Sequence, residues 1–133
     1  MGHAFRELKV WQKSIELTVL VYVFTRSFPK EETYGLMSQM RRASVSIPSN
    51  IAEGSARGTS RDFRHFVRLA QGSNCELQPQ LVLAARLGFG LEETRETLDS
   101  LTCEIGRMLS GLGAHLTDGR DDPGHGSQLT ANN

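Results

Sequence analysis

Apolar residues recur at steps of three and four through four stretches of this chain, and this spacing constrains the fold more than any other feature. Side chains at such steps share one face of an α-helix, whereas a half-buried strand needs alternation at steps of two. The four stretches cover about residues 8–26, 31–54, 59–87 and 92–112. Four helices joined by short loops predict an all-α fold, an up-down-up-down antiparallel four-helix bundle.

The first predicted helix, residues 8–26, is apolar on two opposite faces, roughly 190° apart at about 100° per residue. The face that we assign to the core carries Leu8, Trp11, Ile15, Val19 and Tyr22. A monomeric bundle can bury only one face, so we expect the opposite one to be an oligomer interface. Its interface residues are Leu17, Val21, Phe24 and Phe28. The β-branched run at residues 19–23 leaves a strand as the alternative, although the helical spacing continues on both sides of it.

Two prolines fall inside the periodic pattern instead of ending it. Proline lacks an amide hydrogen and its ring displaces the carbonyl four residues earlier, so we predict a kink in the second helix at Pro48 and one in the third at Pro79. At Pro48 the displaced carbonyl belongs to Ser44. The alternative there is that Asn50 caps a new helix, with Glu53 three residues later.

The third predicted helix has recognisable ends. It begins at a Thr-x-x-Asp sequence, Thr59 to Asp62, which is typical of a helix N-terminus. The sequence Gly-Phe-Gly at 88–90 ends it. Gly72 and Ser73 interrupt its inner face with small residues, which predicts close approach of a neighbouring helix there.

The chain fits one folded domain followed by a tail. Its 133 residues are enough to bury a core without disulfides or metals. From Thr117 onward the composition shifts to Gly, Asp, Asn, Pro and Ser, with little to bury. We therefore expect the four-helix bundle domain to occupy residues 1–116 and residues 117–133 to form a disordered C-terminal tail.

Charge and apolar content restrict the partners and the location of the protein. Fifteen Lys and Arg balance fifteen Asp and Glu, so the molecule as a whole does not indicate a polyanionic partner. Cys75 and Cys103 lack a C-x-x-C spacing and no signal peptide is recognisable, so we expect free thiols and a cytoplasmic protein. The longest apolar run is far shorter than the roughly 18 residues of a spanning helix, so we expect no membrane partner.

Common catalytic and metal-site motifs are absent from the sequence, including G-x-S-x-G, the P-loop, H-E-x-x-H and paired C-x-x-C. Asp62 and His65 stand three residues apart, as do a carboxylate and a histidine in di-iron bundles, but such a centre needs the motif twice and further acidic ligands. We therefore expect no enzyme activity, no catalytic residue, no metal and no cofactor.

The sharpest local feature is a concentration of arginine. Residues 41–68 contain six arginines and two acids, whereas residues 92–122 contain eight acids and three arginines. The last four of the six are spaced by four, three and four residues, so they can form one stripe from the loop into the third helix. The six are Arg41, Arg42, Arg57, Arg61, Arg64 and Arg68.

An arginine stripe at a helix N-terminus suits phosphate, because guanidinium forks and free backbone amides both pair with phosphate oxygens. We therefore take the six arginines as candidate phosphate- or nucleic-acid-binding residues, for RNA or DNA. No aromatic residue lies on the stripe for base stacking, so binding should follow shape and charge. The alternative is that these arginines pair with acids of the fourth helix or of a neighbouring subunit.

Three stretches of the chain carry a resemblance to a known family: FRELKVWQKSIEL, LMSQMRRASVSIPSNIAEGSARG and DFRHFVRLAQGSNCELQPQL with the following RLGF. Over roughly residues 5–114 the chain resembles the 23S rRNA intervening-sequence protein family. The resemblance implies a bundle that assembles into a homopentameric ring, with no defined biochemical role. A more distant relative of that family, the accessory protein of diversity-generating retroelements, binds nucleic acid and a reverse transcriptase.

Two classes of function follow from these observations. The first is an oligomeric module that binds nucleic acid or a nucleoprotein through the arginines. The second is a structural or protein-interaction oligomer whose arginines hold subunits together. An unbroken basic face would favour the first class, and arginines each paired with a carboxylate would favour the second.

Overall fold

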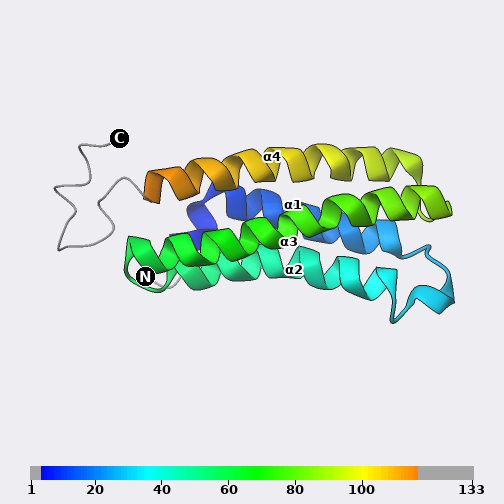
Figure 1. Cartoon of the computed structure of the whole chain (residues 1–133), viewed down its shortest axis with the longest axis horizontal. Helices are drawn as coiled ribbons and strands as arrows, with labels where there is room; N and C mark the ends of the chain where they lie inside the picture. Colours follow the sequence, from blue (N-terminus) through cyan, green and yellow to red (C-terminus); the bar gives the residue numbers. More distant parts are fainter. Residues whose placement is uncertain (1–3, 117–133) are drawn as a thin grey trace.

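The computed structural model describes residues 4–116, which form an antiparallel bundle of four α-helices (Figure 1). Short 3₁₀ turns, η1 and η2, precede the first two helices. The helices are α1 (Lys9–Thr25), α2 (Leu36–Ser55), α3 (Ser60–Leu87) and α4 (Glu92–Leu116), and the turns are η1 (Ala4–Glu7) and η2 (Lys30–Glu32). Each helix contacts two neighbours, in the order α1, α2, α3, α4 and back to α1. The all-α bundle prediction is confirmed.

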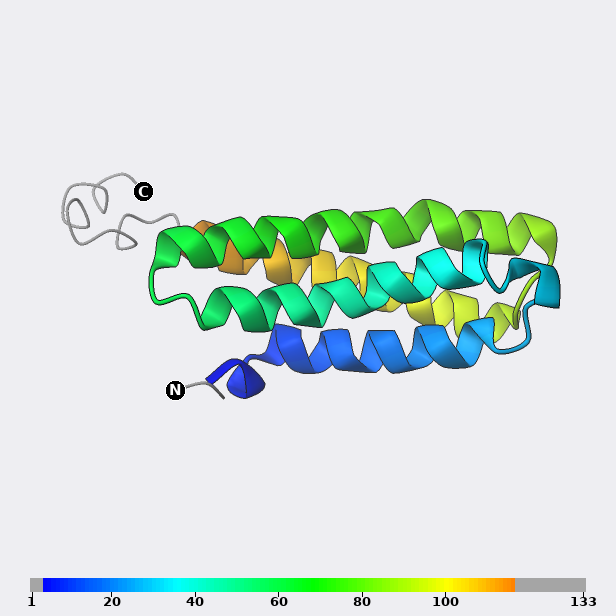
Figure 2. The same ribbon diagram turned by 90° about the horizontal axis from the view of Figure 1, so that it is seen from below.

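The bundle has two distinct ends, which are visible in Figure 2. One end, which we call the terminal end, holds the start of α1, the α2–α3 turn and the last residues of α4. The distal end holds the α1–α2 connection with η2 and the α3–α4 connection at residues 88–91. The arginines of the first turns of α3 therefore lie at the terminal end, and the acids at the start of α4 lie at the distal end.

The structure contradicts our assignment of the two faces of α1. The residues expected at an oligomer interface are instead buried in the subunit's own core: Leu17, Val21, Phe24 and Phe28. The opposite face was assigned to the core. Its Leu8 and Trp11 are partly buried against the core, but Ile15, Val19 and Tyr22 have exposed fractions of 37%, 59% and 39%. An interface through the first set is therefore wrong, and the apolar face left at the surface is the second.

Two contacts explain why α1 faces the core this way. Phe24, Phe28 and Phe89 of the α3–α4 connection form an aromatic cluster. The centre of the Phe28 ring lies 5.4 Å from that of Phe24 and 5.2 Å from that of Phe89. Polar residues on the same face are satisfied within the helix, since the Thr25 hydroxyl donates to the Val21 carbonyl at 2.8 Å. Periodicity alone could not rank two apolar faces, because the deciding aromatic partner comes from another part of the chain.

Both prolines lie within continuous helices, Pro48 in α2 and Pro79 in α3. The alternative that Asn50 caps a new helix is therefore wrong, and its side-chain amide donates instead to the Ser46 carbonyl at 2.8 Å. The bends expected at the two prolines stay predictions. Pro48 has no amide hydrogen to donate to the Ser44 carbonyl. That carbonyl lies 2.9 Å from the Thr18 hydroxyl of α1, which it shares with the Ser14 carbonyl at the same distance.

Local capping signals set the helix ends. The Thr59 hydroxyl accepts a hydrogen bond from the Asp62 amide at 3.1 Å, so the predicted start of α3 is confirmed. Gly88 follows the helix at a φ of 74°, a left-handed value that favours glycine at a helix C-terminus. The second helix begins later than expected, at Leu36, whose amide donates to the Glu32 carboxylate at 2.8 Å.

The predicted C-terminal tail, residues 117–133, lies outside the described residues. Within residues 4–116, every helix is too short or too polar to cross a membrane.

Candidate nucleic-acid interface

The six candidate arginines do not form a single face, because two of them are held by contacts inside the subunit. Arg41 of α2 lies against α1, where its Nε donates to the Thr25 hydroxyl at 2.8 Å. Its guanidinium also stacks 4.4 Å from the centre of the Tyr22 ring. Arg41 therefore joins α1 to α2, and the neighbouring Arg42 is exposed on α2.

Arg57, in the turn between α2 and α3, is also engaged locally. Its Nη2 lies 3.0 Å from the Glu53 carboxylate, and its guanidinium lies 4.8 Å from the centre of the Phe66 ring. The side chains of Arg57 and Glu53 are both about half exposed, so this ion pair is accessible to solvent. The predicted four-residue stripe is therefore interrupted at its first member, because the Arg57 guanidinium is held between Glu53 of α2 and Phe66 of α3.

The remaining three arginines, Arg61, Arg64 and Arg68, occupy the first turns of α3 at the terminal end. Arg64 is half-buried and its Nη1 donates to the Leu116 carbonyl at 3.3 Å, which places it beside the end of α4. Arg61 and Arg68 are exposed, and within residues 4–116 neither forms an ion pair with an acid. These three are the part of the predicted site that the structure brings together.

A hollow of about 260 Å³ opens between α3 and α4 next to these arginines. On the α3 side, Arg64 and Arg68 form one wall of the hollow. On the α4 side, small residues leave the hollow open in front of these two arginines. Its lining residues are Arg64, Val67, Arg68, Gln71, Leu109, Ser110, Gly113 and Ala114. The hollow thus has two guanidinium donors, an amide and a hydroxyl around a space that admits a phosphate-sized anion.

A second hollow of about 600 Å³ adjoins the first, since Gln71 and Ser110 line both. Together we call the two hollows the α3–α4 groove. The second hollow adds Arg107 of α4, which sequence reasoning missed because it looked for arginines spaced along one helix. The contact between α3 and α4 brings Arg107 to the groove, and no local spacing signals that contact.

Two amide side chains of α3 fix the floor of the groove. The Gln71 amide donates to the Gly106 carbonyl at 3.1 Å and to the Ser110 hydroxyl at 3.0 Å. The Asn74 amide donates to the Thr102 carbonyl at 2.9 Å, and the Asn74 side chain is only 2% exposed. Because these bonds tie α3 to the backbone of α4, the groove has a defined width and its arginines stand on fixed elements.

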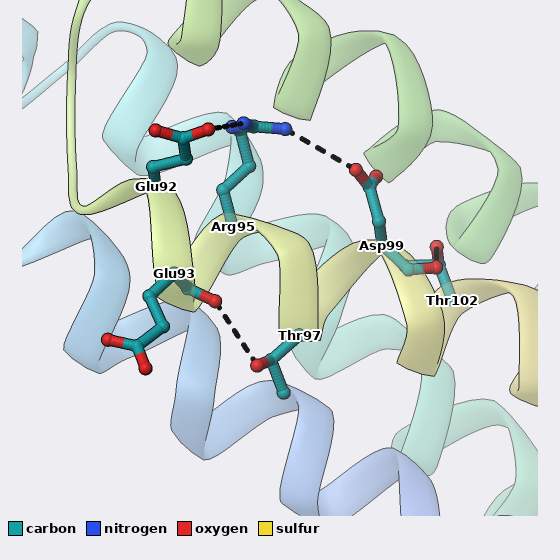
Figure 3. Close-up of polar contacts among 6 residues, drawn as sticks. All are labelled: Glu92, Glu93, Arg95, Thr97, Asp99 and Thr102. Atoms are coloured by element: carbon teal, nitrogen blue, oxygen red, sulfur yellow. Dashed lines mark hydrogen bonds and ion pairs between the residues drawn. The ribbon is translucent and has the colours of Figure 1, made fainter.

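The acids at the start of α4 do not serve the arginines of α3. Figure 3 shows Arg95 between the carboxylates of Glu92 and Asp99, at nitrogen–oxygen distances of 3.8 and 3.5 Å. All three residues belong to the same helix and lie towards the distal end. Within the described chain, Arg61 and Arg68 form no ion pair with an acid of α4. The alternative that acids of the fourth helix neutralise these two arginines is therefore not supported.

Comparisons with known proteins give the same fold. A crystal structure of a protein of unknown function from the S23 ribosomal protein family of Bacteroides thetaiotaomicron superposes with a TM-score of 0.70 at 24% sequence identity. The match covers 79% of this chain and 95% of that one. No curated protein matches the chain. The family model of the 23S rRNA-intervening sequence protein matches residues 6–111, and the chain therefore belongs to the 23S rRNA-intervening sequence protein family.

Proposed function

We propose that this protein is a non-enzymatic, oligomeric four-helix bundle that binds nucleic acid or a nucleoprotein through the arginines of its terminal end. The observation that carries the proposal is the position of Arg64 and Arg68 at the α3–α4 groove, with Arg107 on the facing helix. The exposed Arg61 lies one turn before Arg64 on α3, outside the groove. Guanidinium groups with this spacing can pair with successive phosphates of a nucleic-acid backbone.

The chemistry of the groove favours backbone recognition over base recognition. Its polar groups are guanidiniums, amides and hydroxyls, and no aromatic side chain lines either hollow within the described chain. Base stacking on aromatic rings is the usual source of single-strand binding energy, whereas arginine pairing with phosphate depends on charge and shape. We expect weak sequence preference and strong salt dependence.

Self-association is the second part of the proposal, and the exposed face of α1 supports it. We call Ile15, Val19 and Tyr22 the outer α1 face. Apolar side chains aligned at three- and four-residue steps on an exposed helix favour contact with another subunit. The family resemblance suggests a ring of five subunits, which would repeat the arginine groups around one assembly and strengthen polyanion binding through multivalency.

A structural or protein-interaction oligomer without nucleic-acid contact is the other candidate. The pairing of Arg57 with the Glu53 carboxylate favours it, and Arg41, which Thr25 holds inside the subunit, is likewise engaged away from nucleic acid. Under this candidate the exposed Arg61 and Arg68 would meet acids of a neighbouring subunit. Binding of nucleic acid by the assembled protein separates the two candidates.

The test compares two triple variants by fluorescence anisotropy with labelled duplex DNA and single-stranded RNA at about 50 mM salt. R61A/R64A/R68A removes the arginines of the terminal end. R26A/K30A/R86A removes the same charge from exposed positions at the distal end.

We expect the first variant to bind at least about tenfold more weakly than the unsubstituted protein, because three phosphate contacts are lost, and the second to change by less than about threefold. Equal effects of the two variants would show that binding follows net charge and not this site. No binding by the unsubstituted oligomer to either nucleic acid would leave the protein-interaction candidate.

A further inference from the structure

The α3–α4 groove has cationic side chains on both of its walls. Arg64 and Arg68 stand on α3, and Arg107 stands on α4. The Gln71 amide donates to the Gly106 carbonyl at 3.1 Å, so Arg107, the next residue, lies near the level of Gln71. Gln71 is seven residues from Arg64, which is about 10 Å along a helix. The three arginines therefore border one path along the groove, and Arg107 borders it from the side opposite the other two.

Two amide oxygens at the floor of this groove lack hydrogen-bond partners. Gln71 and Asn74 both line the second hollow, and their side-chain nitrogens donate to carbonyls of α4. Both side-chain oxygens, Gln71 Oε1 and Asn74 Oδ1, are buried, and neither accepts a hydrogen bond within residues 4–116. A buried acceptor without a donor is unfavourable, so this floor favours a ligand that brings a donor to it.

Gly106 keeps the floor uncovered. A Cβ at this position would lie 3.4 Å from Asn74 Nδ2 and 3.8 Å from Gln71 Oε1, which are ordinary contact distances. Alanine would therefore fit here without displacing either amide, and its methyl group would occupy the space beside both of them. The absence of a side chain at Gly106 thus leaves room at the two unpaired oxygens.

Unpaired nucleic-acid bases supply the donors that this floor lacks. Every base carries at least one N–H group on its Watson–Crick edge, and that edge is free to hydrogen-bond a protein only where the base is unpaired. In a duplex the same groups are paired inside the double helix. Packed helices stand about 8–10 Å apart, so a duplex can rest on the groove but cannot bring a base edge down between its walls.

We propose that the α3–α4 groove binds single-stranded nucleic acid, with a base turned towards Gln71 and Asn74 and the neighbouring phosphates at Arg68 and Arg107. This inference rests on the proposed function and narrows its ligand. Because every base offers a donor, the groove selects an unpaired strand and not a sequence. A duplex meets only the arginines at the rim of the groove and binds more weakly.

The inference is tested by fluorescence anisotropy of the full chain at about 50 mM salt, with a labelled single strand of DNA and the duplex that this strand forms with its complement. We expect the single strand to bind at least about fivefold more tightly. We expect Gly106→Ala to weaken single-strand binding by at least about threefold and to leave duplex binding unchanged, because only an unpaired base reaches the floor.

Gly111→Ala is the matched control, since Gly111 lies on the same helix outside both hollows and a Cβ there would meet nothing within 4 Å. Alanine favours a helix interior over glycine, so both variants should stay folded. A loss in Gly106→Ala that is equal for the single strand and the duplex, or no larger than in Gly111→Ala, would overturn the inference.

The phosphate contact on the α4 wall is tested in the same assay through its salt dependence. Arg107→Ala should reduce the salt slope for the single strand by about 0.7, the value for one phosphate contact. Arg86→Ala, which removes the same charge at an exposed distal position, should leave the slope unchanged. Equal slopes in the two variants would overturn the placement of a phosphate at Arg107.

The two ligands also separate this inference from the proposed function. Equal affinity for the single strand and the duplex would overturn the inference, while the proposed function would stand. If the unsubstituted protein binds neither ligand, the proposed function fails and this inference fails with it.

Discussion

Thr18 of α1 supplies the hydrogen bond that Pro48 withholds inside α2. Proline has no amide hydrogen, so the Ser44 carbonyl four residues earlier lacks its usual helical donor. Ser44 is fully buried, and the Thr18 hydroxyl lies 2.9 Å from its carbonyl and equally 2.9 Å from the Ser14 carbonyl of α1, so its one proton is shared between these two acceptors. A buried carbonyl without a partner is costly, so this contact between two helices explains how the proline is accommodated.

We expect Thr18→Val to lower the free energy of unfolding by about 1–3 kcal/mol, because it leaves the Ser44 carbonyl without a donor while keeping the side-chain shape. Urea denaturation measures the change. Thr97→Val is the control, since the Thr97 hydroxyl donates only to Glu93 of its own helix on an exposed face. Pro48→Ala restores an amide donor, so Thr18→Val should cost less in that background, and an equal cost in both would contradict this account.

Gly54 and Gly72 have opposite roles, although both lie within helices. A Cβ on Gly54 would lie 2.7 Å from the Phe66 Cβ, closer than two carbons can pack, whereas a Cβ on Gly72 would meet nothing within 4 Å. The sequence predicted a close helix approach at Gly72 and Ser73. Ser73 does meet α2, where its hydroxyl donates to the Ser46 hydroxyl at 2.8 Å, but Gly72 meets no neighbour, and the glycine at a close approach is Gly54.

We therefore expect Gly54→Ala to destabilise the fold by about 1–3 kcal/mol through overpacking. Gly72→Ala should stabilise it by up to about 1 kcal/mol, because alanine favours an exposed helix interior over glycine. Thermal denaturation of the two variants provides the comparison. Similar changes in the two melting temperatures would mean that α2 and α3 are not packed as described.

At the scale of the helices, the sequence predicted most of what local chemistry determines. The three-four spacing identified all four helices, and Thr59 with the Gly-Phe-Gly sequence at 88–90 marked the ends of α3. The start of α2, expected at about residue 31, was missed by about five residues, since Glu31 and Glu32 lie in η2 and the helix begins at Leu36. The sequence could not show which of the two apolar faces of α1 is buried, because burial depends on contacts with Phe89, far along the chain.

The two faces of α1 predict different outcomes for substitution. We expect Leu17→Ala to lower the free energy of unfolding by about 2–5 kcal/mol, because Leu17 is fully buried in the core. Val19→Glu, on the outer α1 face, should change subunit stability by less than about 0.5 kcal/mol and weaken self-association.

Sedimentation equilibrium at micromolar concentration tests the second expectation, with Leu69→Glu on exposed α3 as the matched control. A monomeric unsubstituted protein would contradict the proposed oligomer. Equal loss of association in both variants would move the interface away from the outer α1 face.

At the scale of the whole molecule, the neutral composition hides a separation of charge. Arg61, Arg64 and Arg68 lie at the terminal end and the acids of early α4 at the distal end, so the net charge of zero hides a local excess of arginine at the start of α3. Local counting along the sequence found this segregation. It did not separate Arg41 and Arg57, held within the subunit, from Arg61 and Arg68, because that difference depends on tertiary contacts.

The most direct test of the central claim is the salt dependence of nucleic-acid binding. For duplex DNA, the logarithm of the affinity falls against the logarithm of salt concentration with a slope of about −0.9 for each phosphate neutralised. We predict that R61A/R64A/R68A makes this slope less steep by about two to three per subunit engaged, while R26A/K30A/R86A leaves it unchanged. A slope that is the same in the unsubstituted protein and in R61A/R64A/R68A would contradict the claim that these arginines contact phosphate.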